Sequence, residues 1–340
     1  MRILIYEHFS AGAADSPVDG EELQRQGFGM LRACVEDGLE AGHRVQTVLD
    51  RRLEGALPAG CRIAPAPPGQ ALSLFEAMLP EVDAVLPIAP ETAGTLASLT
   101  SLVERSGKLL LGSSAQATQI AGDKFASALA LADHGCKVPF TALWPVPVER
   151  LPGSGPWILK PRRGTGCEGI CLTASPQAAC LPAGEYVVQE YVPGAAASVA
   201  MIVGERSVLI ASVNLQRVVF APSVAHGGAG AVPHYRGGAI PLAHPLSQAA
   251  RIAARNIPRA IAGLRGYVGV DVVLTGQDVY IIEVNPRITV AYCGLRRVVS
   301  ENLMQLIIDA GLGRDLPDEI RVAGSVQFDD SGHVIEPLRA

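Results

Sequence analysis

The sequence predicts an α/β domain followed by an α+β region whose sheets are antiparallel. Three observations favour this fold class. Short apolar segments alternate with helical segments over residues 1–112, which is the pattern of a parallel sheet. After residue 157, turns separate most apolar segments, as they do between antiparallel strands. Apolar segments at 269–274 and 280–285 flank a polar turn and predict a hairpin.

The first predicted domain spans residues 1–112. Its strands are expected at 1–6, 44–49, 82–87 and 109–111. Apolar residues at helical spacing predict a helix over 21–41, which Gly42 ends, and a second helix is expected over 91–106. The proline-rich segment 58–68 is expected to form a loop within this domain.

Two further units are predicted over residues 113–194 and 195–340. In the first of these, Ser114 and Asp123 can cap helices that run to about residues 120 and 134. Strands are expected at 157–159, 186–189, 198–203 and 208–215. A glycine-rich loop over 226–238, which we interpret as a candidate lid, and a helix over 245–264 precede the hairpin.

Composition narrows the class of protein. Hydrophobic residues make up 49% and charged residues 18%, as in a well-packed globular protein. The chain has no apolar run of ~18 residues and no signal-peptide pattern, so a cytoplasmic protein without a membrane segment is expected. A net charge of −5 without basic clusters argues against nucleic-acid binding. The seven cysteines show no paired spacing, so neither a disulfide framework nor a zinc site is predicted.

Three oxygen-bearing side chains occur on the predicted hairpin. If its loop consists of residues 276–278, Asp271 lies opposite Glu283, and Asn285 follows two positions later on the same face. Such hard oxygen ligands suit Mg²⁺, which protein carboxylates usually bind together with substrate phosphates. The pattern therefore predicts a magnesium site, although solvated acids on an edge hairpin would look the same.

Lysine is scarce in this chain, where it accounts for only four of the 28 basic residues. Lys160 ends a predicted strand, and the turn after it contains Gly164, Thr165 and Gly166. Glycine allows backbone N–H groups to approach an anion, so this turn and its lysine suit phosphate binding, although a purely structural turn would look the same. The strand end at 189–192 offers polar side chains and backbone groups that can contact the rim of an adenine, or is an ordinary strand end.

The order of these motifs resembles the ATP-grasp superfamily. The motifs are GDK at 122–124, Lys160 with its glycine-rich turn, QEYVPG at 189–194, and Asp271 with ExN at 283–285. The resemblance implies a fold that sandwiches ATP between two α+β units, and a reaction that joins a carboxylate to an amine through an acylphosphate. It also implies a pre-ATP-grasp domain at 1–112, a central subdomain at 113–194 and a C-terminal subdomain at 195–340.

The same resemblance implies roles for individual residues. The nucleotide-binding residues would be Lys124, Lys160, Gly164, Thr165, Gly166, Gln189, Glu190, Tyr191 and Val192. Asp271, Glu283 and Asn285 would bind Mg²⁺ or Mn²⁺, with two ions expected. Arg287 and Lys160 would be catalytic, and the substrate would contact Gly227, Gly228, Arg287 and Thr289. Many members hold the ribose with an acid after the QEYVPG position, but residues 195–198 read AAAS here, so the ribose contact is unassigned.

A narrower resemblance is to the tyramine–glutamate ligases and their relatives in methanofuran-type one-carbon cofactor synthesis. Its motifs are YEHFSAG at 6–12, EELQRQGFGML at 21–31, VNLQ at 213–216, the glycine pair at 227–228 and NPRIT at 285–289. It implies small-molecule partners, namely a glutamate-like carboxylate and a tyramine-like or tyrosine-like amine, and a homodimer is one assembly to test.

Other functions remain open at this point. An amino-acid ligase acting on a pterin cofactor, a peptide or D-alanine would carry the same motifs. A regulatory protein that binds ATP without turnover is a second alternative. A Rossmann dehydrogenase is disfavoured because no GxGxxG motif follows the first strand.

Overall fold

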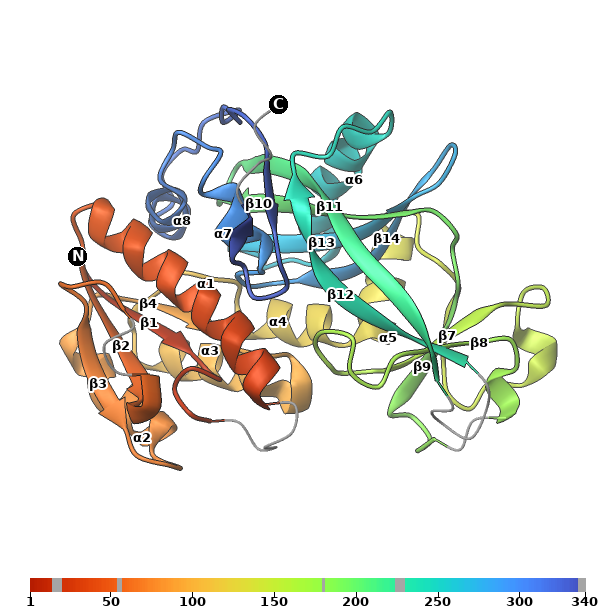
Figure 1. Cartoon of the computed structure of the whole chain (residues 1–340), viewed down its shortest axis with the longest axis horizontal. Coiled ribbons are helices and arrows are strands. Elements are labelled where there is room, and N and C mark those ends of the chain that lie inside the picture. Colours follow the sequence, from red (N-terminus) through yellow and green to blue (C-terminus); the bar gives the residue numbers. More distant parts are fainter. Residues whose placement is uncertain (14–19, 54–56, 179–180, 224–229, 336–340) are drawn as a thin grey trace.

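A computed structural model describes residues 1–13, 20–53, 57–178, 181–223 and 230–335 of the chain. The first domain contains a five-stranded parallel sheet with the order β3-β2-β1-β4-β5 (Figure 1). Its strands are β1 (Arg2–Glu7), β2 (Arg44–Asp50), β3 (Arg62–Ala66), β4 (Ala84–Ile88) and β5 (Leu109–Leu110). Its helices are α1 (Gly20–Glu40), α2 (Ala71–Met78) and α3 (Thr95–Arg105). The predicted parallel sheet is therefore confirmed.

Two local predictions for this domain were wrong. Residues 62–66, expected within a loop, form β3 and pair in parallel with β2. β3 is the edge strand, and an edge strand tolerates Pro65 because one side of its backbone needs no partner. The helix expected over 91–106 begins only at Thr95, after a 3₁₀ turn over Thr92–Gly94.

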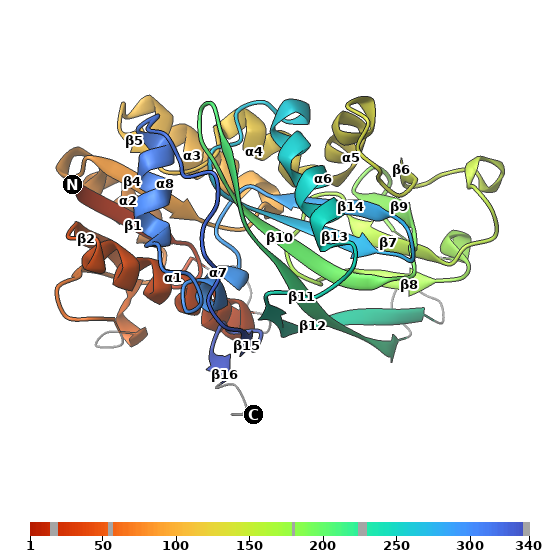
Figure 2. The same ribbon diagram turned by 90° about the horizontal axis from the view of Figure 1, so that it is seen from above.

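The rest of the chain is built on an eleven-stranded sheet with the path β14-β13-β10-β11-β12-β8-β7-β9-β6, and with β15 and β16 attached through β12 (Figure 2). Its neighbours along the path pair antiparallel. The strands are β6 (Thr141–Leu143), β7 (Trp157–Pro161), β8 (Cys171–Thr173), β9 (Tyr186–Glu190), β10 (Ala195–Val203), β11 (Val208–Ser223), β12 (Gly230–Ile240), β13 (Gly266–Leu274), β14 (Val279–Asn285), β15 (Val326–Phe328) and β16 (Val334–Ile335). The helices are α4 (Ala115–Gly122), α5 (Lys124–Asp133), α6 (Ser247–Ala260), α7 (Ala291–Leu295) and α8 (Leu303–Gly311).

The glycine-rich loop predicted over 226–238 is wrong from Gly230 onward, because these residues belong to β12; residues 226–229 lie outside the described residues. A side chain at Gly237 would collide with the backbone of β15, and one at Gly238 with the carbonyl oxygen of Leu215. The glycines therefore allow neighbouring strands to approach closely, and do not mark a flexible segment.

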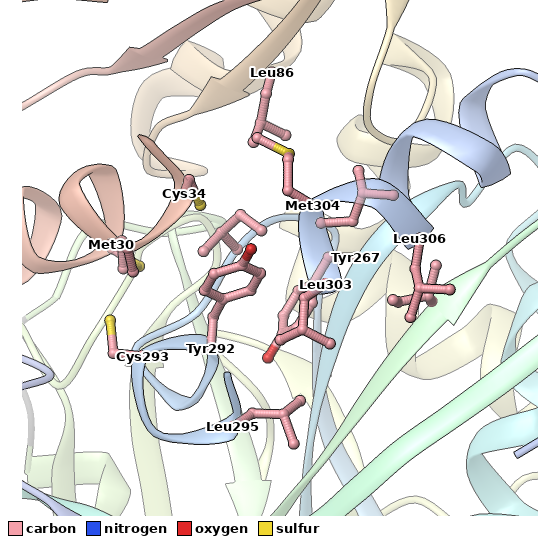
Figure 3. Packing of buried hydrophobic residues seen from close by; sticks show 14 of the residues in the cluster. Met30, Cys34, Leu86, Tyr267, Tyr292, Cys293, Leu295, Leu303, Met304 and Leu306 are labelled. Atoms are coloured by element: carbon pink, nitrogen blue, oxygen red, sulfur yellow. The ribbon is translucent and has the colours of Figure 1, made fainter. Parts of the chain in front are cut away.

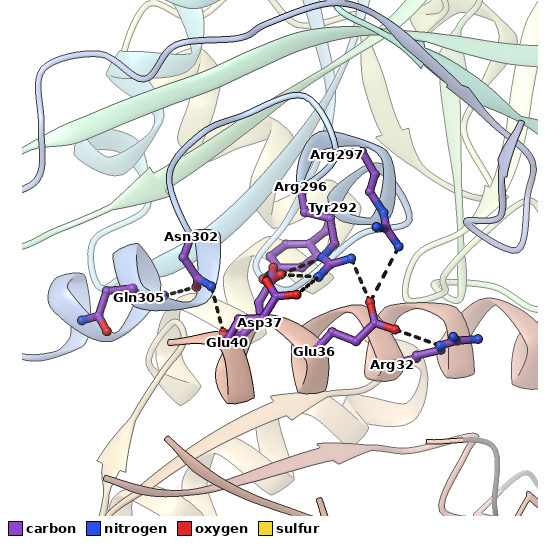
Figure 4. A network of polar contacts seen from close by, with 9 residues as sticks. All are labelled: Arg32, Glu36, Asp37, Glu40, Tyr292, Arg296, Arg297, Asn302 and Gln305. Carbon is purple, nitrogen blue, oxygen red and sulfur yellow. Dashed lines mark hydrogen bonds and ion pairs between the residues drawn. The ribbon is translucent and has the colours of Figure 1, made fainter. Parts of the chain in front are cut away.

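The largest apolar cluster joins the first domain to the end of the chain. Cys34 of α1 is fully buried with Tyr292 of α7 and Met304 of α8 (Figure 3). Leu31 of α1 is fully buried in the same cluster. A polar network with a buried centre lies beside this cluster (Figure 4). In it, Asp37 pairs with Arg296 at 2.6 Å and accepts a hydrogen bond from the Tyr292 hydroxyl at 2.6 Å. Apolar packing and buried ion pairs thus fix α1 against α7 and α8.

Within the described part of the chain, no helix has both the length and the apolar character needed to cross a bilayer.

Candidate active site

The hairpin β13–β14 brings the two predicted metal-binding carboxylates opposite each other, as Asp271 pairs with Glu283. The route to this register differs from the prediction. The tip has four residues, 275–278, because Leu274 already pairs with Val279. That register alone would place Asp271 opposite Ile282. A β-bulge at Ile282 adds the missing residue and restores the Asp271–Glu283 pair.

The carboxylate of Asp271 is held by two amides. Gln216 Nε2 donates to its Oδ1 at 2.8 Å, and Asn285 Nδ2 donates to its Oδ2 at 3.1 Å. Burial raises the pKa of Asp271 to about 6, and the charge of Glu283 adds to this effect. Two carboxylates and a carboxamide are therefore gathered in a partly buried position, where a bound cation would relieve the repulsion between the carboxylates.

Lys124 is the first residue of α5, and Asp123 caps that helix by accepting from the N–H groups of Phe125 and Ala126. The Lys124 ammonium lies 2.9 Å from Glu283 Oε1 and donates to the Gly164 carbonyl at 2.7 Å. Burial alone would raise the pKa of Glu283, but the charges of Lys124 and Lys160 hold that pKa below its usual value. The lysine therefore connects the helix start, the glycine-rich turn and the metal hairpin.

Lys160 lies on β7 and is only 3% exposed. Its Nζ donates to Gln189 Oε1 at 2.9 Å, and Gln189 in turn donates to the Thr141 hydroxyl. Burial lowers the pKa of Lys160 to about 8. Both predicted lysines thus reach the same charged region from different strands and helices. A small pocket beside them is lined by Lys124, Gln189, Ile282 and Glu283 together with apolar side chains.

The segment after β9 differs from the expected open strand end. β9 is an interior strand between β7 and β6. The Glu190 N–H donates to Phe140, and the Tyr191 N–H donates to Pro156, so these two donors are already used. A contact with an adenine rim would therefore have to use other groups of the segment, such as its carbonyls or the backbone of Val192.

Arg287 lies at the centre of the polar contacts. Its Nη2 donates to the Thr165 hydroxyl of the glycine-rich turn at 2.6 Å and approaches Asn285 Oδ1 at 3.5 Å. Its other partner is Glu91 of the first domain, with Nε 2.9 Å from Oε1 and Nη2 3.0 Å from Oε2. In the same turn, Gly166 has a φ of 65°, a conformation that favours glycine.

Two acids lie at the carboxyl edge of the parallel sheet. Sequence reasoning singled out residues 6–12 at this edge but assigned no role to Glu7, and it missed Glu91. Glu7 ends β1 and is buried, with Ser10 N donating to Oε2 at 2.7 Å; burial raises its pKa to about 7. Glu91 follows β4, the strand that pairs with β1. The available signal was a charged residue just past an apolar parallel strand, where open α/β sheets bind ligands. Glu91 was instead interpreted as the start of a helix.

The structure describes only some of the predicted substrate-binding residues. Gly227 and Gly228 lie outside the described residues. The Thr289 hydroxyl is within 3.2 Å of the Tyr267 hydroxyl, and a side chain at Gly269 would overlap Thr289. Thr289 therefore packs beneath β13 in the described structure.

Two known domain families match the chain, and together they cover most of the site residues. The ATP-grasp domain matches residues 121–291, which include Lys124 at one end and Arg287 at the other. The chain belongs to the ATP-grasp family. The pre ATP-grasp 3 domain matches residues 43–118, so Glu91 lies in the pre-ATP-grasp part and its partner Arg287 in the ATP-grasp domain.

Solved ATP-grasp structures support the fold. An ATP-grasp superfamily protein from Archaeoglobus fulgidus is similar over 97% of this chain and 92% of its own, with a TM-score of 0.73 and 22% identity. The L-amino acid ligase from Bacillus licheniformis is similar over 96% of this chain and 78% of its own, with a TM-score of 0.67 and 15% identity. At these identities the similarity establishes the fold alone.

A curated ATP-grasp relative is more similar in sequence. The tyramine–L-glutamate ligase of Methanocaldococcus fervens is 31% identical over 233 residues, which is 67% of this chain. The aligned region spans 66% of that relative's length, so about a third of the relative is unmatched.

Proposed function

We propose that this protein is an ADP-forming carbon–nitrogen ligase that uses ATP to join an amino-acid carboxylate to an amine. The observation that carries the proposal is the convergence of Lys124, Lys160 and Arg287 on the Asp271–Glu283 pair. Two buried lysines and the partly buried Arg287 lie beside two carboxylates. This set suits a triphosphate and its metal, because phosphate oxygens and metal ions supply the missing charges of both signs.

The residues at the hairpin fit Mg²⁺ or Mn²⁺. Among the described residues, no group of three or more His, Cys, Asp and Glu side chains could hold a metal, so a self-contained protein cage of such ligands is not indicated there. Asp271, Glu283 and Asn285 would instead provide part of a ligand set that phosphate oxygens complete, with two ions expected. When bound, the metal supplies charge neutralisation for the phosphates.

The chain's own residues would neutralise the charge of the phosphates and position the reacting groups. Lys124 and Lys160 bind phosphate oxygens of ATP, and residues 189–192 contact the adenine. A substrate carboxylate oxygen attacks the γ-phosphorus, ADP leaves, and an acylphosphate forms; the amine then attacks its carbonyl carbon and releases phosphate. Arg287 stabilises the anionic group that reacts. Thr165 brings the glycine-rich turn over this position, which helps to exclude water from the acylphosphate.

We propose glutamate as the carboxylate and tyramine or a tyrosine-like amine as the acceptor, in methanofuran-type one-carbon cofactor synthesis. The relative from Methanocaldococcus fervens supports this choice by its name, and the chain's YEHFSAG and NPRIT motifs agree with it. The acceptor would approach from the carboxyl edge of the parallel sheet, where Glu7 and Glu91 lie.

A phosphate-release screen tests the proposal. The purified protein is incubated with ATP, Mg²⁺, glutamate and a panel of amines. Phosphate release that needs glutamate and an amine together is the expected result, with tyramine among the active amines. ATP binding without turnover on any acid and amine would instead identify a nucleotide sensor. Turnover only with other amino acids would reject glutamate and keep the ligase. Light scattering on the same sample tests the homodimer.

A further inference from the structure

Glu91 belongs to the first domain, yet it contacts the residue at the centre of the ATP-grasp site. It is 5% exposed, and its side chain and that of Arg287 are 3% and 11% exposed. Nε of Arg287 lies 2.9 Å from Glu91 Oε1 as an ion pair without hydrogen-bond alignment, and Nη2 donates to Oε2 at 3.0 Å. The pair is therefore buried and joined by charge and one hydrogen bond.

The backbone around Glu91 is shaped to hold this side chain inward. Ala93 has a φ of 53°, and it is the sole non-glycine residue with positive φ in the part of the chain that the structure covers. Gly94, with a φ of 72°, continues the turn. On the opposite side, a Cβ at Gly122 would come within 3.0 Å of Glu91 Cβ. A strained turn and a glycine thus both favour the inward position of Glu91.

The contact with Glu91 uses one particular edge of the guanidinium. A guanidinium presents a side-on edge, made by Nε and Nη2, and an end-on edge, made by Nη1 and Nη2. Glu91 occupies the side-on edge. The end-on edge contacts the carbonyl oxygen of Ile288 through Nη1 and the Thr165 hydroxyl through Nη2. These neutral partners can yield to an anion, which binds a charged donor more strongly.

We propose that Glu91 is a positioning residue of the first domain that fixes the side-on edge of Arg287 and thereby aims its end-on edge at the reacting anion of the substrate. This inference rests on the proposed function, because the anion is the substrate carboxylate or the acylphosphate made from it. It explains why the ATP-grasp site needs the preceding domain: without Glu91, the buried arginine lacks its only described carboxylate partner within ion-pair distance.

The test compares Glu91→Gln with a matched control. Asp37→Asn removes the charge of another buried acid that pairs with an arginine and joins the first domain to the end of the chain, but it lies in the α1–α7 network. Thermal unfolding shows whether both variants fold. Steady-state rates of ADP formation with ATP, glutamate and tyramine then give the KM for each substrate.

Glu91→Gln is expected to raise the KM for glutamate about 10- to 100-fold, the range for losing a hydrogen bond to a charged group, and to change the KM for ATP less than about threefold. Asp37→Asn is expected to change neither KM. Glu91→Asp keeps the charge, so it should recover part of the affinity, and it serves as the test variant if Glu91→Gln does not fold. An equal effect on both substrates, or equal effects of Glu91→Gln and Asp37→Asn, would show a purely structural role and overturn the inference.

A second measurement separates this inference from the choice of substrate. If the wild-type protein does not turn over glutamate, the proposed substrates are wrong, and inorganic phosphate then serves as the anion. Its affinity for the protein with MgADP is measured by calorimetry. Weaker phosphate binding by Glu91→Gln, with Asp37→Asn unchanged, supports the positioning role. Equal phosphate affinity in the wild type and Glu91→Gln overturns it.

Discussion

At the scale of single residues, Glu283 is the carboxylate that faces both site lysines. It is paired with Lys124, and the charge of Lys160 also acts on it. Glu283→Ala is expected to abolish ADP formation with every substrate, because it removes a proposed metal ligand and leaves the lysines without their counter-charge. Initial rates of ADP release check this.

The matched control for Glu283→Ala is Asp278→Asn at the tip of the same hairpin. Asp278 pairs with the half-exposed Lys137 at 2.6 Å, away from the converging cations. Its loss should leave the rates unchanged, because an exposed ion pair contributes about 1 kcal/mol or less to stability. A folded Glu283→Ala protein with substantial turnover would contradict the metal assignment.

The lowered pKa of Lys160 predicts that the kcat/KM for ATP depends on pH. Burial lowers the pKa of its ammonium to about 8, and only the charged form attracts phosphate. The kcat/KM for ATP reports the free enzyme, so it should fall as pH rises through about 8. In Lys160→Arg this decline should disappear, since arginine stays protonated. A wild-type kcat/KM that stays level up to about pH 10 would contradict this role.

The Lys160 ammonium also makes the free energy of unfolding depend on pH. In the unfolded chain a lysine keeps its proton up to about pH 10.4, whereas folded Lys160 loses it near pH 8. Between these values the unfolded state binds more protons. The contribution of Lys160 to the free energy of unfolding therefore rises with pH across this window.

At the scale of elements, the start of α5 fixes Lys124. Asp123 caps this helix and also pairs with Arg162 at 2.7 Å and Arg163 at 3.3 Å. Asp123→Ala should lower the free energy of unfolding by about 2 kcal/mol or more, since both a cap and charged hydrogen bonds are lost. It should also raise the KM for ATP, because Lys124 is the first helical residue. Urea unfolding and initial rates measure the two effects.

Ser114→Ala, which removes the cap of the neighbouring helix α4, is the control for Asp123→Ala. Ser114 caps α4 by accepting from Ala117 N at 3.2 Å, so its loss should cost about 1 kcal/mol and leave the KM for ATP unchanged. If both variants change the KM equally, the cap of α5 does not hold Lys124 in place.

The hairpin β13–β14 also belongs to this scale, and it shows which features of a hairpin the sequence pattern predicts and which it does not. Two apolar segments around a polar turn predicted both strands, and an assumed loop over 276–278 predicted the Asp271–Glu283 pair. The predicted three-residue tip was wrong, and the pair forms only because Ile282 is bulged. A bulge depends on how the whole strand packs, so a short polar turn does not reveal it.

At the scale of the whole molecule, the first domain shares its core with the end of the chain. Leu31 of α1 is buried in one cluster with Tyr292 and Met304. A chain containing only residues 113–340 would expose this surface and lose Glu91. We expect it to lack the cooperative thermal transition of the full chain, measured by circular dichroism. A shorter chain that unfolds cooperatively at the same temperature would show that the two parts are independent.

The sequence by itself predicted many of the helices and strands, the parallel and antiparallel sheet types, and Lys124, Lys160, Asp271 and Glu283 as candidate site residues. These features depend on local periodicity, helix caps and side-chain chemistry, which neighbouring residues encode. The order of the motifs that contain these residues resembled the ATP-grasp superfamily before any geometry was known.

Tertiary contacts decided two features that the sequence did not predict, namely strand β12 and the Glu91–Arg287 ion pair. Residues 230–240 contain glycines typical of a loop, but they form β12 because β11 pairs with most of them and β15 pairs with their last three residues. Glu91 reaches Arg287 across 196 positions of sequence, and nothing local to either residue marks that meeting. Long-range pairing and burial choose among conformations that local sequence leaves nearly equal in free energy, which is why these features emerge only in the folded chain.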